Sequence, residues 1–160
     1  KTNSVIDLYL REQNKLGYYD RKGSGKLRFV SHKLSRDIIS VGEGIEIEFS
    51  IQVNAHIDKV MFHVNLYSDE ENWYAQVSSE DDDFALANAD LGETRTIKCK
   101  IPYINAAPGR YYLNLWAGNA FEEYDWLQHC MEITIGQGDT YIKRVTTYPN
   151  AAMVLKSEWK

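Results

Sequence analysis

The chain has 160 residues, 44% hydrophobic and 26% charged, which is typical of one globular domain and excludes a disordered or collagen-like chain. Its 18 basic and 23 acidic residues give a net charge of -5, which argues against binding to nucleic acid phosphates. No apolar run approaches the roughly 20 residues that span a bilayer, and no signal peptide pattern opens the chain.

The first predicted element is a short helix at residues 4–16, for which Ser4 is the expected N-cap. We interpret residues 1–22 as a linker, and the first residue, Lys1, suggests a piece of a longer protein. After residue 25 apolar and polar residues alternate with a period of two, which is typical of half-buried strands. Strands are predicted at residues 26–30, 45–53, 60–67, 73–79, 94–101, 110–117, 130–135 and 152–155.

About eight short strands without a strong central helix predict an all-β fold, an immunoglobulin-like antiparallel β-sandwich. We assign this sandwich to residues 23–160. Its last part, residues 139–160, runs on past the core strands and still carries apolar side chains. Such a segment needs a surface to cover it, either on its own sandwich or on that of a partner.

The two cysteines do not fit the disulfide of an antibody-type sandwich, which joins facing central strands. Cys99 falls on the inward phase of its predicted strand, whereas Cys130 falls on the outward phase of another. Reduced thiols in a cytoplasmic protein are therefore expected.

Three sequence features resemble parts of catalytic or metal-binding motifs, but none has the full set of residues that its motif requires. The segment 23–26 lacks the first glycine and the final hydroxyl of a phosphate loop. The acidic cluster at 80–83 lacks the glycine turn of a calcium loop, and the carboxylates at 122–125 are too close in sequence to flank a glycosidase cleft. We expect no catalytic residue, no metal and no cofactor.

The strongest functional signal is the predicted outward face of neighbouring strands. In the segment 110–117 one phase is apolar and must face the core, while the other phase is both polar and aromatic. The segments 60–67 and 73–79 follow the same pattern, provided that Trp73, Ala75 and Val77 point inward. In an immunoglobulin-like order these strands are neighbours. The candidate ligand-binding residues are His63, Asn65, Tyr67, Tyr74, Gln76, Arg110, Tyr112, Asn114 and Trp116.

Rings flanked by amides are suited to carbohydrate, because flat apolar faces stack on sugar C–H groups while amides bind hydroxyls. Arg110 or His63 would meet an anionic terminal group if the glycan carries one. Two alternatives stay open, a solvated sheet face and a dimer contact. Trp126, in a predicted loop, is interpreted as a core side chain rather than a ligand contact.

Several motifs carry a resemblance to a known family. They are the opening strand at residues 21–29, the turn at 41–44, the strand at 108–113, the segment 124–127 and the closing residues 157–159. In their order and spacing the chain resembles the C-terminal domain of the ATP-binding subunit of O-antigen polysaccharide ABC transporters, the Wzt family.

The resemblance implies an immunoglobulin-like sandwich that binds O-antigen polysaccharide, often at its modified non-reducing end, and couples chain completion to export. It further implies a homodimer with an exchanged C-terminal strand, for which residues 139–160 would be the dimerisation tail. An upstream nucleotide-binding domain and a transmembrane transporter subunit are implied as further partners. The expected location is cytoplasmic, peripheral at the inner membrane through the transporter. The alternative is an assembly module that has no ligand of its own.

Overall fold

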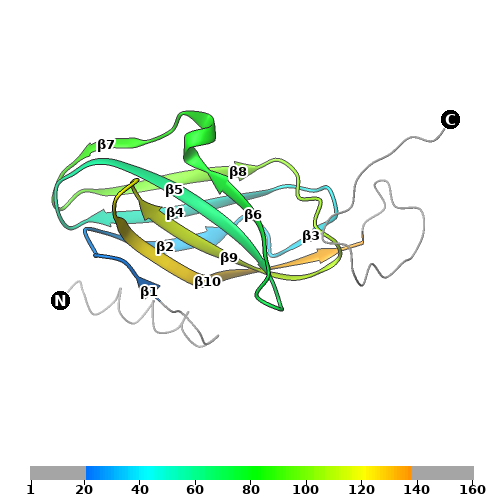
Figure 1. Ribbon diagram of the computed structural model, residues 1–160. Helices are drawn as coiled ribbons and strands as arrows, with labels where there is room; N and C mark the ends of the chain where they lie inside the picture. Colours follow the sequence, from blue (N-terminus) through cyan, green and yellow to red (C-terminus); the bar gives the residue numbers. More distant parts are fainter. Residues whose placement is uncertain (1–20, 138–160) are drawn as a thin grey trace, which may run out of the picture.

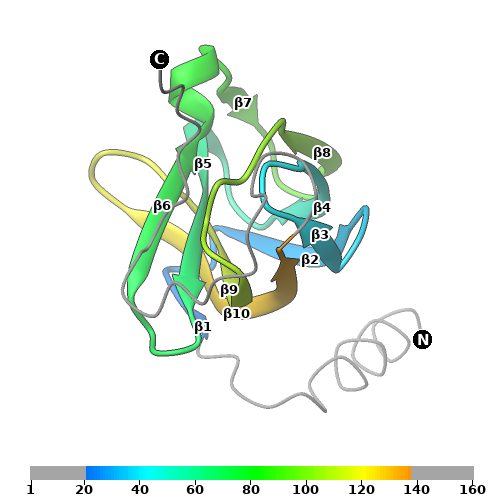
Figure 2. The same cartoon turned by 90° about the vertical axis from the view of Figure 1, so that its right-hand side faces the viewer.

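The computed structural model describes residues 21–137, which form two β-sheets packed face to face (Figures 1 and 2). The larger sheet has the order β1-β10-β9-β5-β6, with β3 joined to β10 and β7 joined to β5, and the smaller sheet has the order β2-β4-β8. The strands are β1 (Arg21–Lys22), β2 (Leu27–Leu34), β3 (Ile38–Ser40), β4 (Ile45–Val53), β5 (Ile57–Ser68), β6 (Trp73–Ser78), β7 (Leu86–Ala89), β8 (Thr94–Ile101), β9 (Gly109–Gly118) and β10 (Glu123–Gly136).

The predicted all-β sandwich is confirmed, but the strand count of about eight was wrong, because ten strands lie within residues 21–137 alone. The unpredicted strands β1, β3 and β7 have two to four residues each, too few to show an alternating pattern. One pair, β3 with β10, is parallel, while the other pairs of the two sheets are antiparallel. The predicted helix at 4–16, the predicted strand at 152–155 and the tail at 139–160 lie outside the described residues.

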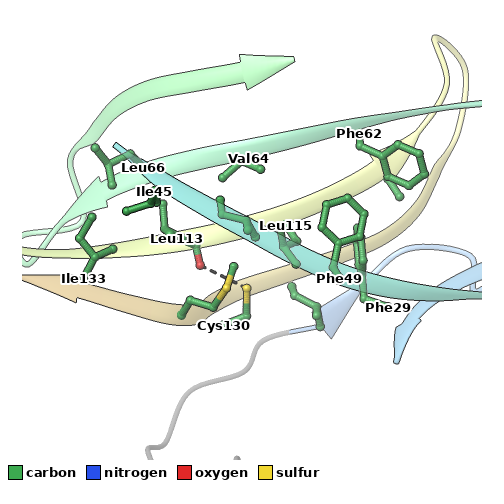
Figure 3. Close-up of a cluster of buried hydrophobic side chains, with 14 of the residues drawn as sticks. Phe29, Ile45, Phe49, Phe62, Val64, Leu66, Leu113, Leu115, Cys130 and Ile133 are labelled. Carbon is green, nitrogen blue, oxygen red and sulfur yellow. Dashed lines mark hydrogen bonds between the residues drawn. The ribbon is translucent and has the colours of Figure 1, made fainter. Parts of the chain in front are cut away.

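The core lies between the two sheets and is built from the inward phases that the sequence predicts (Figure 3). Phe49 of β4 contacts Phe29 of β2 and Phe62 of β5, with ring centroids 5.3 and 5.5 Å apart. The inward residues of β5 and β9 are buried, among them Val64, Leu66, Leu113 and Leu115. Their burial forces the intervening side chains of both strands onto the outer face of the larger sheet.

Strand β10 is interrupted by a bulge between Leu127 and Met131, within which His129 has a left-handed backbone with φ of 49°. The extra residues shift the alternation, so the expectation that Cys130 points outward was wrong. Its thiol is buried and donates to the carbonyl oxygen of Leu113 at 3.3 Å (Figure 3), and burial raises its pKa to about 12. As expected, no disulfide joins it to Cys99.

A buried carboxylate ties the start of β10 to β1 and β2. Asp125 is fully buried, and its oxygens accept hydrogen bonds from Arg21 Nε at 2.9 Å, Arg21 Nη2 at 2.6 Å and Arg28 Nη1 at 2.6 Å. The backbone N–H of Phe29 donates to the same carboxylate at 2.7 Å. The connection between β1 and β2 comes so close that a Cβ on Gly23 would lie 2.6 Å from the carbonyl oxygen of Tyr124. Asp125 therefore links the start of β10 to both β1 and β2.

Replacing this carboxylate tests its structural role. We expect Asp125→Asn to lower the free energy of unfolding by about 3 kcal/mol, because two guanidinium groups lose their buried counterion. Urea denaturation followed by circular dichroism measures the change. Glu122→Gln is the matched control, since the half-buried Glu122 binds Lys26 at a similar distance, 2.6 Å, where solvent reaches and screens the pair. Equal losses in the two variants would contradict the assignment.

Candidate functional site

The outer face of the larger sheet brings together the residues predicted from β5 and β9. Three pairs lie directly opposite one another in the register of these strands: His63 with Trp116, Asn65 with Asn114, and Tyr67 with Tyr112. Opposite residues of antiparallel strands share a face of the sheet. The expected adjacency of the two rows is confirmed, and we call these six residues the central patch.

One end of the central patch is a stack of two flat side chains. The imidazole of His63 lies on the indole of Trp116, with centroids 4.4 Å apart and planes 16° from parallel. A Cβ on Gly118 would lie 2.5 Å from the Trp116 ring, so glycine leaves room for the indole to lie there. The indole N–H donates to Glu123 Oε2 at 2.9 Å, which fixes the ring orientation.

The other end is a second stack, formed by Tyr112 and His129 with centroids 4.8 Å apart. His129 comes from the bulge of β10, and its backbone N–H donates to Asn114 Oδ1 at 2.6 Å. The bulge thus places the imidazole of His129 next to the central patch. The sequence pattern did not predict this contact, since a residue in a bulge does not follow the alternation of a strand.

Between the two stacks lie the side chains of Asn65 and Asn114, only 8% and 2% exposed although they belong to the outer face. Asn114 accepts the bond from His129, but Asn65 Oδ1 is buried and has no hydrogen-bond partner among residues 21–137. A buried carbonyl oxygen without a donor costs free energy, so this atom marks a place where a ligand donor would be favourable.

Strand β6 contributes only part of what was predicted. Gln76 lies opposite Asn65 and is exposed, in line with the prediction. The orientations of Tyr74 and Trp73 were predicted wrongly: Tyr74 contacts the buried Tyr111 and packs on the core, whereas Trp73 is 62% exposed. A register shift next to Tyr67 reverses the alternation at this point of the sheet.

The interpretation of Trp126 as a core side chain was also wrong. Trp126 is half-buried on β10, opposite Trp116, and so adds a further ring to the outer face. The ammonium of Lys22 lies 5.3 Å from its ring centroid. Its neighbours Asp125 and Leu127 are both buried, and the residue between two inward residues of a strand points outward.

Arg110 lies at the rim of the face and is held by a carboxylate of the turn after β5. Its Nε donates to both oxygens of Asp69 at 3.0 and 3.1 Å, and its Nη2 donates at 2.8 Å. Hydrogen bonds from the guanidinium lower the pKa of Asp69, so the pair stays ionised at neutral pH. The guanidinium of Arg110 is thus paired with a carboxylate of the same chain.

Residues 21–137 contain no group of three or more His, Cys, Asp or Glu side chains arranged to hold a metal ion. The acidic segment at residues 80–83 belongs to a short 3₁₀ helix, Ser79–Asp82, and to its cap. Within the same residues no helix has the length and hydrophobicity needed to cross a membrane.

The burial of His63 predicts the order in which His63 and His56 become protonated as the pH falls. Burial lowers the pKa of His63 below 6.5, whereas hydrogen bonds to Asp90 and then Asp58 raise the pKa of the exposed His56 above it. We expect an NMR titration of the imidazole C–H signals to show His63 titrating below His56. Since the unfolded chain binds this proton more tightly, the stability contribution of His63 is lost as pH falls from 6.5 through the lowered pKa.

Trp116→Ala is the companion variant, because it uncovers the imidazole and moves the His63 pKa back toward 6.5. The His56 signal serves as the internal control and should not move. A His63 pKa at or above that of His56 would contradict the stacked, desolvated geometry.

Comparisons with known proteins bear on the whole of this fold. The crystal structure of the C-terminal domain of Wzt superimposes with a TM-score of 0.75 at 12% identity, covering 90% of this chain and 89% of that one. The alkylpurine DNA glycosylase AlkC of Pseudomonas fluorescens reaches 0.49 at 14% identity, covering 71% of this chain and 31% of its own. The cupredoxin domain of amoB from Nitrosocaldus yellowstonii reaches 0.47 at 10% identity, covering 81% and 99%.

At this level of identity the Wzt structure supports the fold alone, and the other two likenesses carry no argument. A search of curated proteins found no match. The family model described as the Wzt C-terminal domain, however, matches residues 19–146, which is most of the sequence. The chain therefore belongs to the Wzt C-terminal domain family.

Proposed function

We propose that the chain is a non-catalytic module that binds O-antigen polysaccharide on the outer face of its larger sheet. The observation that carries the proposal is the central patch, where two ring stacks flank a pair of buried amides. Membership of the Wzt C-terminal domain family supports a role in O-antigen export.

The chemistry of the patch suits a saccharide. The rings of Trp116 and Tyr112 offer apolar surface for the C–H faces of sugars, and Trp126 extends this surface onto β10. Asn65, Asn114 and Gln76 supply amides that bind hydroxyl groups. Tyr67 and His63 complete the patch, and Arg110 with Asp69 forms its rim.

The proposed place of the module is in the ATP-binding subunit of a polysaccharide ABC transporter. There it would bind the polysaccharide, at its modified non-reducing end, and couple chain completion to export. The full protein would carry an upstream nucleotide-binding domain, form a homodimer and lie in the cytoplasm against the inner membrane beside the transmembrane subunit. A weak site on each of two subunits would gain avidity from the dimer.

Removing a ring tests the location of the site. We expect Trp116→Ala and Tyr112→Ala each to weaken polysaccharide binding at least about tenfold, roughly 1.4 kcal/mol, because each removes a stacking surface. Isothermal titration calorimetry with the cognate O-antigen polysaccharide measures the affinity. Tyr103→Ala is the matched control, since this ring is 63% exposed in the segment between β8 and β9 and contributes nothing to the central patch.

Circular dichroism establishes that the variants remain folded. Unchanged affinity in both ring variants would place the site elsewhere. Sedimentation analysis separates the assembly alternative: a dimer that dissociates when Trp116 or Tyr112 is replaced, in a protein that binds no polysaccharide, would favour an assembly module.

A further inference from the structure

Two positively charged groups beside the central patch, those of Arg110 and Lys22, are already engaged within the described part of the chain. The guanidinium of Arg110 is bound in bidentate fashion by Asp69, and the Lys22 ammonium lies over the Trp126 ring. Burial lowers the pKa of His63, so this imidazole is neutral at pH 7. An incoming anion would therefore compete with Asp69 for the guanidinium instead of meeting an available cation.

Carboxylates surround the central patch on several sides. Glu123 accepts the indole N–H of Trp116 at 2.9 Å, and the exposed Glu132 lies opposite Tyr112. Glu80 and Asp81 are close enough to His63 to raise its pKa, although desolvation outweighs them. Asp69 adds a further carboxylate at the rim, so the side chains described around the patch are mainly acidic. The negative charge of a phosphate or carboxylate on the ligand would be repelled by these groups.

The centre of the patch requires a donor. Asn65 is 8% exposed, and its Oδ1 has no partner among residues 21–137. Only a group that carries a proton satisfies this oxygen, such as a sugar hydroxyl or an acetamido N–H. An ionised phosphate or carboxylate has acceptor atoms alone and would leave Asn65 Oδ1 unsatisfied.

We infer that the outer face selects an uncharged saccharide surface, rich in hydroxyl or acetamido groups, and discriminates against phosphorylated or carboxylated sugars. The inference rests on the proposed function and adds the chemical class of the ligand. It differs from the expectation that Arg110 or His63 would meet an anionic terminal group if the glycan carries one.

The first test uses an array of bacterial polysaccharides grouped into neutral, N-acetylated, uronic-acid and phosphorylated polymers. At about 20 mM salt the Debye length is roughly 20 Å, so charge effects are large. We expect the strongest binding among neutral or N-acetylated polymers, with acidic polymers of similar backbone bound at least tenfold more weakly. Preferential binding of acidic polymers would overturn the inference and leave the proposed function standing. Absence of binding to every polymer would instead contradict the proposed function.

The second test alters the charge of the rim. Asp69→Asn releases the Arg110 guanidinium, and we expect the affinity ratio of acidic to neutral polymer to rise about tenfold. The matched control is Glu70→Gln, which removes one negative charge from the adjacent position of the same turn without contacting Arg110. The ratio should be unchanged in that variant. An identical affinity ratio in the two variants would show that the Asp69–Arg110 pair does not affect the selection between acidic and neutral polymers. The inference would then fail.

Discussion

The register between β5 and β9 is the constraint on which the outer face depends. A shift of one residue would turn Val64 and Leu66 outward and bring the amides and rings into the core. Turning Trp116 toward Phe49 would separate its indole N–H from Glu123 and leave it without a partner in the core, so the apolar interior favours a single register. The arrangement proposed to bind saccharide is thus a direct consequence of how the core packs.

Strand β10 completes the face in two ways. At its start, the buried Asp125 carboxylate ties it to Arg21 and Arg28, and the next residue, Trp126, is thereby placed on the outside next to Trp116. In its middle, a bulge brings His129 onto Tyr112 and gives Asn114 its partner. Strands β5 and β9 alone would supply two rows of side chains, and these features of β10 add the third.

The sequence predicts the regular parts of the structure well. Long alternating runs such as residues 45–53 identify strands because burial on one face imposes the pattern. The errors concern Tyr74, Trp126 and Cys130, which lie at or near register shifts, where an inserted residue reverses the alternation. Contacts such as that between His129 and Tyr112 depend on this local geometry and on long-range strand pairing. The periodicity of the sequence therefore does not predict them. The charge balance of the face likewise emerges only when distant acidic residues are brought next to β9.

The most direct measurement is heteronuclear NMR of the protein titrated with the polysaccharide that it binds best on the array. The side-chain amide signals of Asn65 and Asn114 and the indole N–H signal of Trp116 should shift together and saturate at one ligand concentration. Shifts confined to β2, β4 and β8 of the smaller sheet would contradict the central claim that the ring and amide face of the larger sheet is the binding surface.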